Sequence, residues 1–254
     1  MISLTGKAAL ITGGSRGIGA ACVKLFAQAG ADVVFSFHRE LESAERVAQE
    51  ARRHSTRVEF FKADLAKMAP AEKLVQFTHE RLGRLDILVA NAGIWNVDDL
   101  PIEKMAERDW DRMMAVNLKS VYSVIHFSVP HMIRQKSGRI IALSSTAGQR
   151  GEAFHTHYGA TKGAIISLVK GLSTELAPHN ILVNSVAPGW VDTDMSKPAF
   201  GDKKTMKQIL EKQPLGRVAT AEECAGPVLF LASDLSSYIT GEILNVNGGS
   251  VLCG

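Results

Sequence analysis

The sequence contains few cysteines, and they are scattered. Only three of its 254 residues are cysteine, Cys22, Cys224 and Cys253, and no Cys-x-x-Cys pair occurs. Disulfide frameworks and structural zinc sites both need paired or clustered cysteines, so the sequence predicts neither. We therefore expect a reducing compartment, which we take to be the cytoplasm.

Long apolar runs and basic runs are also missing. No stretch approaches the ~18 apolar residues of a membrane span, and the first residues show no basic segment followed by a long apolar one, as a signal peptide would. The net charge is only +3, and no Lys/Arg-rich segment concentrates it. With 46% hydrophobic and 22% charged residues, the composition is typical of a soluble globular protein. We expect neither a membrane nor a nucleic acid as partner.

Apolar segments alternate with helix-like patterns along the whole chain. The predicted strands cover residues 7–12, 32–37, 57–63, 85–90, 138–144, 181–187 and 242–246. Continuous apolar runs are typical of strands buried on both faces of a parallel sheet. Because no linker or change of composition interrupts the alternation, we predict a single α/β domain over residues 1–254. Its fold would be a doubly wound, Rossmann-type parallel sheet of about seven strands with helices on both faces.

One segment departs from this regular alternation. Residues 195–214 are charged and flanked by proline. Such a stretch between a strand and the last helix often forms a movable cover over a site. We predict a substrate lid there.

The first strand leads into a glycine-rich turn and then a helix. The turn reads Thr12-Gly13-x-x-x-Gly17-x-Gly19, and the stricter G-x-G-x-x-G pattern fails because it would need a third glycine at Cys22. A turn of this kind points backbone N–H groups and a helix N-terminus at a phosphate. We predict that it binds a dinucleotide through Thr12, Gly13, Ser15, Arg16, Gly17, Ile18 and Gly19.

The end of the second strand bears on the choice of cofactor. An acidic residue there would accept hydrogen bonds from a free ribose 2′-hydroxyl, as an NAD site needs. The chain instead has Phe37, His38 and Arg39, with Arg16 in the glycine turn. Two guanidinium groups suit a 2′-phosphate better than a hydroxyl. We predict a preference for NADP(H), with NAD(H) as the other possible cofactor, unless Arg39 only begins a solvated helix.

Two further groups follow strands at the edge where open α/β sheets bind ligands. Asp64 and Leu65 follow the third predicted strand, and Asp64 either contacts adenine or caps a helix. Asn91-Ala92-Gly93 follows the fourth, and its small residues would let the backbone approach a flat ligand closely. We predict cofactor contacts for both groups.

A tyrosine and a lysine stand four residues apart where a helix is predicted to begin. Tyr158 and Lys162 would lie on one face of that helix. At roughly 4 Å and an effective dielectric of about 20, the ammonium would stabilise a phenolate by roughly 4 kcal/mol. The pKa of Tyr158 would then fall by up to about 3 units, toward the range where it can exchange a proton at neutral pH. Taken alone, the pair fits a surface helix better than a catalytic site.

Three other polar residues have two interpretations. Asn117 falls in an otherwise apolar helical pattern, and is either satisfied by backbone groups or functional. His155 and His157 share a face of an extended segment, but no third ligand stands at a suitable spacing. We predict no metal site and take the two histidines as loop or pocket residues.

Together the motifs resemble the short-chain dehydrogenase/reductase family over about residues 4–249. Ser145 lies thirteen residues before Tyr158. The resemblance rests on Thr12-Gly13-x-x-x-Gly17-x-Gly19, Asn91-Ala92-Gly93, Asn117, Ser145, Tyr158-x-x-x-Lys162, Pro188-Gly189, Thr193 and Val246-Asn247-Gly248-Gly249.

The resemblance implies a role for each catalytic residue. Tyr158 would exchange a proton with the substrate oxygen, and Ser145 would hydrogen-bond that oxygen. Lys162 would lower the tyrosine pKa and hold the nicotinamide ribose, while Asn117 would anchor a water of a proton relay. The nicotinamide amide and diphosphate would be held by Pro188, Gly189, Val191 and Thr193. Hydride would pass directly between nicotinamide and carbon without a metal, and the chain would form a homotetramer through its long helices.

Within the family the chain is most similar to the 3-oxoacyl-(acyl-carrier-protein) reductases. This resemblance implies a carbonyl substrate, either a small molecule or an acyl group on a carrier protein, and Lys136 and Arg139 are predicted to meet an acidic carrier. Two departures from that group are His179, where a basic arginine is common, and about two extra residues between Gly93 and Asn117. Sugar, polyol and steroid dehydrogenases share the motifs, and a non-catalytic nucleotide sensor is a further alternative. The substrate pocket is predicted to contain Trp95, Gln149, His155, Trp190 and residues 195–214.

Overall fold

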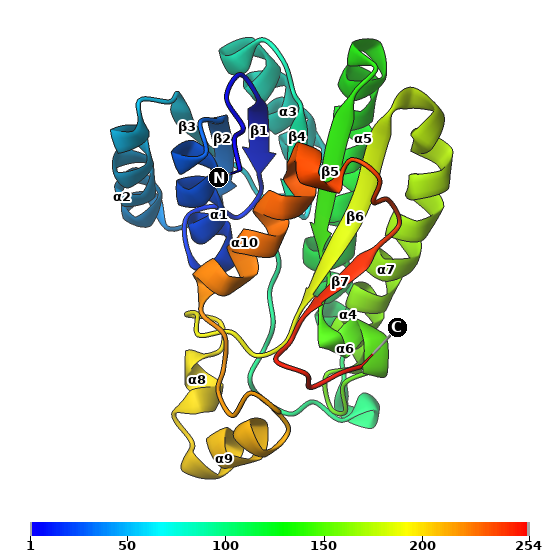
Figure 1. Ribbon diagram of the computed structural model, residues 1–254. Helices are drawn as coiled ribbons and strands as arrows, with labels where there is room; N and C mark the ends of the chain where they lie inside the picture. Colours follow the sequence, from blue (N-terminus) through cyan, green and yellow to red (C-terminus); the bar gives the residue numbers. More distant parts are fainter. Residues whose placement is uncertain (1, 253–254) are drawn as a thin grey trace.

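Seven parallel strands form one sheet in a computed structural model that describes residues 2–252 (Figure 1). The strand order is β3-β2-β1-β4-β5-β6-β7, so the chain reverses its direction of winding between β1 and β4. The strands are β1 (Ala8–Ile11), β2 (Asp32–Phe37), β3 (Val58–Lys62), β4 (Ile87–Ala90), β5 (Gly138–Leu143), β6 (Ile181–Pro188) and β7 (Ile243–Val246). The predicted fold class is confirmed, and each predicted strand is present within one or two residues at either end.

Helices cover both faces of the sheet (Figure 1). One face carries α1 (Gly17–Gln28), α2 (Leu41–Ala51) and α10 (Ala221–Ala232). The other face carries α3 (Met68–Leu82), α5 (Ser120–Gln135) and α7 (Thr156–Leu176). Alternate strand residues serve the two cores, so that Ala9 and Ile11 pack in the first and Ala8 and Leu10 in the second. Burial on both faces explains why the strands are continuous apolar runs.

Shorter elements connect these layers. They are η1 (Arg52–His54), η2 (Ile102–Lys104), α4 (Glu107–Met113), η3 (Met114–Lys119), α6 (Thr146–Arg150), η4 (Ala177–His179), α8 (Lys197–Phe200), α9 (Lys203–Glu211) and η5 (Asp234–Ser236). The segment η3 is a π-helix that joins α4 to α5 without a break. The sequence predicted a helical pattern around Asn117, and the π-helical turn is a local feature that this pattern does not reveal. The helices α8 and α9 lie beyond the carboxyl ends of the strands (Figure 1), where a doubly wound sheet binds its ligands.

The basic pair predicted to meet a carrier protein lies at the opposite end of the sheet. Arg139 is the second residue of β5, whereas Ser145 follows the other end of that strand. The Arg139 side chain is only 17% exposed and forms an ion pair of 3.5 Å with Asp234. That Lys136 and Arg139 meet an acidic carrier protein stays a prediction, and it concerns a surface at the other end of β5 from Ser145.

Two of the three cysteines lie in the described part of the chain. Cys22 and Cys224 are buried free thiols, and burial raises the pKa of both, that of Cys224 to about 12. Cys253 lies outside the described residues. Within residues 2–252, no helix is both long and apolar enough to cross a membrane.

Candidate active site

The glycine turn leaves the N-terminus of α1 open. Arg16 is the N-cap of this helix, no side chain caps it, and its first turn contains no acidic residue. Its first N–H groups therefore lack side-chain partners and carry the positive end of the helix dipole, which suits a phosphate. Gly19 must be glycine because a Cβ there would lie 2.1 Å from the Gly13 carbonyl oxygen. Gly13 itself has a φ of +68°, which favours glycine.

Hydrogen bonds between the ends of β1 and β4 fix the floor beside this turn. The Thr12 hydroxyl oxygen accepts from the backbone N–H groups of Asn91 and Ala92, at 3.0 and 2.9 Å. The Asn91 side-chain amide donates to the carbonyl oxygens of Thr12 and Gly13, at 2.9 and 3.2 Å. The two polar side chains predicted as cofactor contacts thus hold the backbone in place.

A groove of about 770 Å³ runs from this turn past the ends of β2 and β3. Of the predicted cofactor residues, it is lined by Gly13, Ser15, Arg16, Gly17, Ile18, Gly19, His38, Arg39, Asp64, Leu65, Asn91, Ala92, Gly93 and Thr193. Thr12 does not line it, because its side chain is buried under the turn. Arg112 and Val116 also line the groove, and the sequence offered no signal for them because their approach depends on how α4 and η3 are placed.

A smaller cavity of about 170 Å³ adjoins the groove at the carboxyl ends of β4, β5 and β6. Ser145, Tyr158 and Lys162 line it together with Pro188, Gly189 and Val191. The two cavities share the lining residues Ile18, Asn91, Gly93, Ile94, Thr193 and Met195. An extended ligand can therefore lie in the groove and place one end in the small cavity, as a dinucleotide would.

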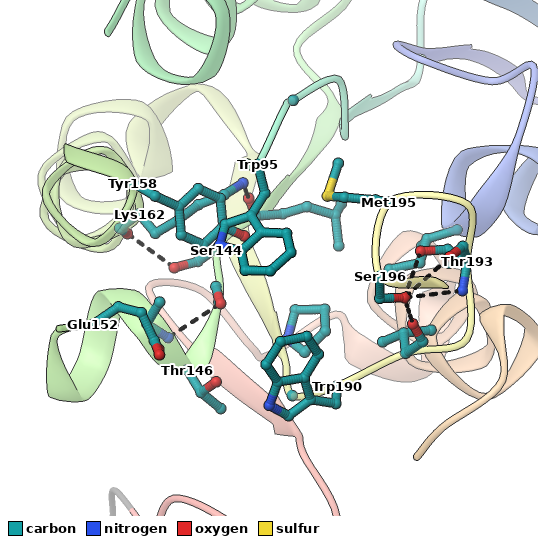
Figure 2. A pocket seen from close by; sticks show the side chains of 18 of the residues that line it. Trp95, Ser144, Thr146, Glu152, Tyr158, Lys162, Trp190, Thr193, Met195 and Ser196 are labelled. Carbon is teal, nitrogen blue, oxygen red and sulfur yellow. Dashed lines mark hydrogen bonds between the residues drawn. The ribbon is translucent and has the colours of Figure 1, made fainter. Parts of the chain in front are cut away.

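Tyr158 lies in the first turn of α7 and faces this cavity (Figure 2). Burial raises the pKa of its phenol to about 12, a hydrogen bond with the Ser145 side chain partly offsets this rise, and the nearby carboxylate of Glu152 adds to it. The prediction of a lowered tyrosine pKa is therefore wrong for this structure. The main reason is burial of the phenol, and Lys162, whose ammonium lies 5.7 Å from the centre of the tyrosine ring, is not among the causes of the shift.

Lys162 points instead at the end of β5. Its Nζ donates to the Leu143 carbonyl oxygen at 2.7 Å, and the residue is only 5% exposed. Burial lowers the pKa of this ammonium to about 8. The group is therefore charged at neutral pH and neutral a little above it.

Asn117 is fully buried in η3 and holds the backbone of the neighbouring loop. Its Oδ1 accepts from the Ile94 N–H at 2.7 Å, and its Nδ2 donates to the Ile94 carbonyl oxygen at 2.8 Å. Nδ2 also lies 3.0 Å from the Met113 sulfur. Of the two interpretations of this residue, these contacts support an asparagine satisfied by backbone groups, which fixes the loop that carries Trp95.

The residues that line the small cavity differ in part from those predicted for the substrate pocket. Trp95, Trp190, Met195 and Ser196 line it as expected. Gln149 does not, because its amide donates to Asn245 Oδ1 at 2.6 Å. His155 does not line it either, since it stacks behind Trp95 with ring centres 5.0 Å apart.

Four polar lining residues were not predicted, and one of them is Ser144 at the end of β5. Thr146 and Glu152 line the cavity, and so does Arg150, which pairs with Glu152 at 2.6 Å. These three come from α6 and the loop after it, whose path the sequence did not fix. Within residues 2–252, no group of three or more histidine, cysteine, aspartate or glutamate side chains is placed to hold a metal ion.

Comparisons with known proteins agree with this geometry. A family model described as enoyl-(acyl carrier protein) reductase matches residues 13–250. The 3-oxoacyl-(acyl-carrier-protein) reductase of Thermotoga maritima is 39% identical over 98% of this chain and 99% of its own length. That of Chlamydia muridarum is 42% identical over 97% and 98%.

Solved structures show the same architecture. A variant of a Serratia marcescens short-chain dehydrogenase/reductase has a TM-score of 0.90 at 38% identity, covering 97% of this chain and 98% of its own. A Burkholderia cenocepacia short chain dehydrogenase in complex with NADP has the same TM-score and coverage at 32% identity. The chain therefore belongs to the short-chain dehydrogenase/reductase family of oxidoreductases.

Proposed function

We propose that this protein reduces the ketone of a 3-oxoacyl thioester to a hydroxyl group, with NADPH as the reductant. The observation that carries the proposal is the meeting of Ser145, Tyr158 and Lys162 in a small cavity that opens onto a dinucleotide-sized groove. Relatives of about 40% identity over nearly the whole chain, named as 3-oxoacyl-(acyl-carrier-protein) reductases, support the choice of substrate.

The residues present fit a nicotinamide dinucleotide. The open N-terminus of α1 would face its diphosphate. Pro188, Gly189, Val191 and Thr193 would hold the nicotinamide end, and Lys162 its ribose. A dinucleotide bound in this way supplies the hydride.

The chain's own groups would then manage the substrate oxygen. Ser145 would donate a hydrogen bond to the ketone oxygen and polarise it. Tyr158 keeps its proton at neutral pH because its pKa is raised, so it would act as the acid that protonates that oxygen. The Lys162 ammonium would stabilise the phenolate left behind, and Asn117 would hold the loop over the site and anchor a water of the relay that returns the proton.

We also propose that residues 195–214 act as a lid. Met195 and Ser196 already line the small cavity, and α8 and α9 follow directly.

Assembly of the chain into a homotetramer through α5 and α7 follows from the family resemblance and is testable by light scattering.

A panel of substrates tests the function. We expect NADPH oxidation with 3-oxoacyl thioesters. When the acyl group is attached to an acidic carrier protein, kcat/KM should be higher at low salt than at high salt. The panel should include an enoyl thioester, because the matching family model is described as an enoyl reductase, and sugars and secondary alcohols. Far higher kcat/KM with a sugar, polyol or enoyl thioester than with any 3-oxoacyl thioester would overturn the proposal.

The preference for NADPH depends on two unpaired guanidinium groups. Arg16 and Arg39 line the groove with His38, and within residues 2–252 neither arginine forms an ion pair. A charge-assisted hydrogen bond contributes about 1.5–3 kcal/mol, which solvent exposure reduces. We therefore expect the ratio of kcat/KM for NADPH over NADH to be about tenfold or more, and Arg39→Ala to remove most of it.

The matched control for this prediction is Arg46→Ala. Arg46 lies in α2 as an exposed residue and does not line the groove. We expect it to leave the cofactor ratio unchanged. Equal efficiency with both cofactors in the wild type, or a preference that survives Arg39→Ala, would show that Arg39 does not read the 2′-phosphate.

A further inference from the structure

Two indole rings face the small cavity from the ends of β4 and β6, the strands on either side of β5. Trp95 follows β4 and Trp190 follows β6, and both line the cavity (Figure 2). Their ring centres are 5.7 Å apart and their planes meet at 89°. They form an aromatic corner beside the position where the ketone must lie to reach Tyr158.

Each indole has another ring behind it. His155, which is 5% exposed, stacks on Trp95 with ring centres 5.0 Å apart and planes inclined at 25°. Phe200 of α8 packs on Trp190 with ring centres 5.8 Å apart. Neither indole can swing outward without giving up a ring contact.

The loop that carries Trp95 is also fixed by its backbone. Asn117 holds both backbone polar groups of Ile94, the residue before Trp95. The Leu100 N–H donates to the Phe154 carbonyl oxygen at 3.0 Å, which ties this loop to the segment that carries His155. The Trp95 side of the corner is therefore fixed, whereas the ring behind Trp190 belongs to the proposed lid.

The space in front of this corner is small. The cavity measures about 170 Å³, close to an engineered cavity of about 150 Å³ that holds one benzene molecule. Part of it borders Gly93, Pro188 and Gly189, where the nicotinamide end is proposed to lie. Only a few carbon atoms of a substrate can share it.

The two sides of the cavity differ in polarity. Thr146 and the carboxylate of Glu152 lie on the same side as Tyr158, whereas Met195 lies on the opposite side with the indoles between (Figure 2). Thr193 and Ser196 lie beside Met195, but their hydroxyl groups are within hydrogen-bond distance of each other, and that of Ser196 also donates to the backbone. The polar thioester branch of a 3-oxoacyl group suits the side that carries Thr146 and Glu152. The alkyl branch is then directed at the indoles, which stand in the path of each added methylene group.

We propose that Trp95 and Trp190 are specificity-determining residues that restrict the enzyme to 3-oxoacyl thioesters with short acyl chains, the four-carbon chain being preferred. The inference rests on the proposed function. It goes beyond that function because it predicts that thioesters with longer acyl chains are poor substrates.

The test is a series of 3-oxoacyl thioesters of four, six, eight and twelve carbons, measured as kcat/KM with saturating NADPH. In the wild type we expect a fall of about tenfold or more from four to eight carbons, since one unaccommodated methylene group already costs about tenfold. Trp95→Leu and Trp190→Leu should flatten the series by raising kcat/KM for eight and twelve carbons. Trp110→Leu, the third tryptophan, lies in α4 outside the cavity lining and should leave the steep series unchanged.

The outcomes separate the two proposals. Equal kcat/KM for four and twelve carbons in the wild type would overturn the restriction and leave the proposed function intact. No reduction at any chain length would overturn the function, and the restriction with it. If a leucine variant fails to fold, the wild-type series and the Trp95→Phe variant still test the restriction. If kcat/KM falls as steeply with chain length in folded Trp95 and Trp190 variants as in the wild type, neither residue determines the chain length.

Discussion

Replacement of Tyr158 by phenylalanine is expected to lower kcat by about 10²–10⁴-fold, the usual contribution of a general acid. The substitution removes the transferable proton and leaves the ring that lines the cavity. NADPH binding should stay within a small factor of wild type, because the open end of α1 and the arginines of the groove are untouched. Single-turnover reduction and NADPH fluorescence titration measure the two effects separately.

Tyr122→Phe is the matched control for this change. Tyr122 lies on α5, is 45% exposed and does not line the cavity, so the variant should reduce substrate at the wild-type rate. A Tyr158→Phe enzyme that retains a tenth or more of the wild-type rate, with the chemical step limiting, would remove Tyr158 from the role of acid.

Lys162→Met is expected to lower kcat/KM for reduction by about a hundredfold or more, the scale for loss of one charged group that stabilises the transition state. The wild-type ammonium, whose pKa is lowered to about 8 by burial, is charged below that pH and neutral above it. The phenol of Tyr158, with its pKa raised to about 12, stays protonated on both sides. Wild-type kcat/KM should therefore be level below pH about 8 and fall above it.

The origin of this alkaline limb is tested in the variant. Lys162→Met should show low activity with no limb near pH 8, whereas Lys170→Met, an exposed residue farther along α7, should behave as wild type. A limb near pH 8 that persists in Lys162→Met would assign it to another group.

The sequence was sufficient to predict the fold because its apolar runs encode burial directly. β2 was predicted at its observed ends, Asp32 and Phe37. The groove residues were predicted as a group because parallel strands bring their carboxyl ends to one edge.

Features set by tertiary packing could not be predicted. The pKa of Tyr158 depends on how deeply the phenol is buried and on where the Lys162 side chain ends, and sequence spacing specifies neither. Gln149 was placed in the pocket by its position in the chain, but it turns to Asn245 on β7. The ion pair of Arg139 with Asp234 joins two residues far apart in the chain, so sequence spacing could not reveal it.

The pairing of β1 with β4 has a consequence for how the protein folds. Thr12 and Asn91, whose hydrogen bonds fix the floor of the groove, are 79 positions apart in sequence, so the groove exists only after a large chain loop has closed. Contacts of such long range form slowly and late. Dinucleotide binding during refolding should therefore report completion of the sheet, and should lag behind the gain of helical signal from α1 and α2, which form from local contacts.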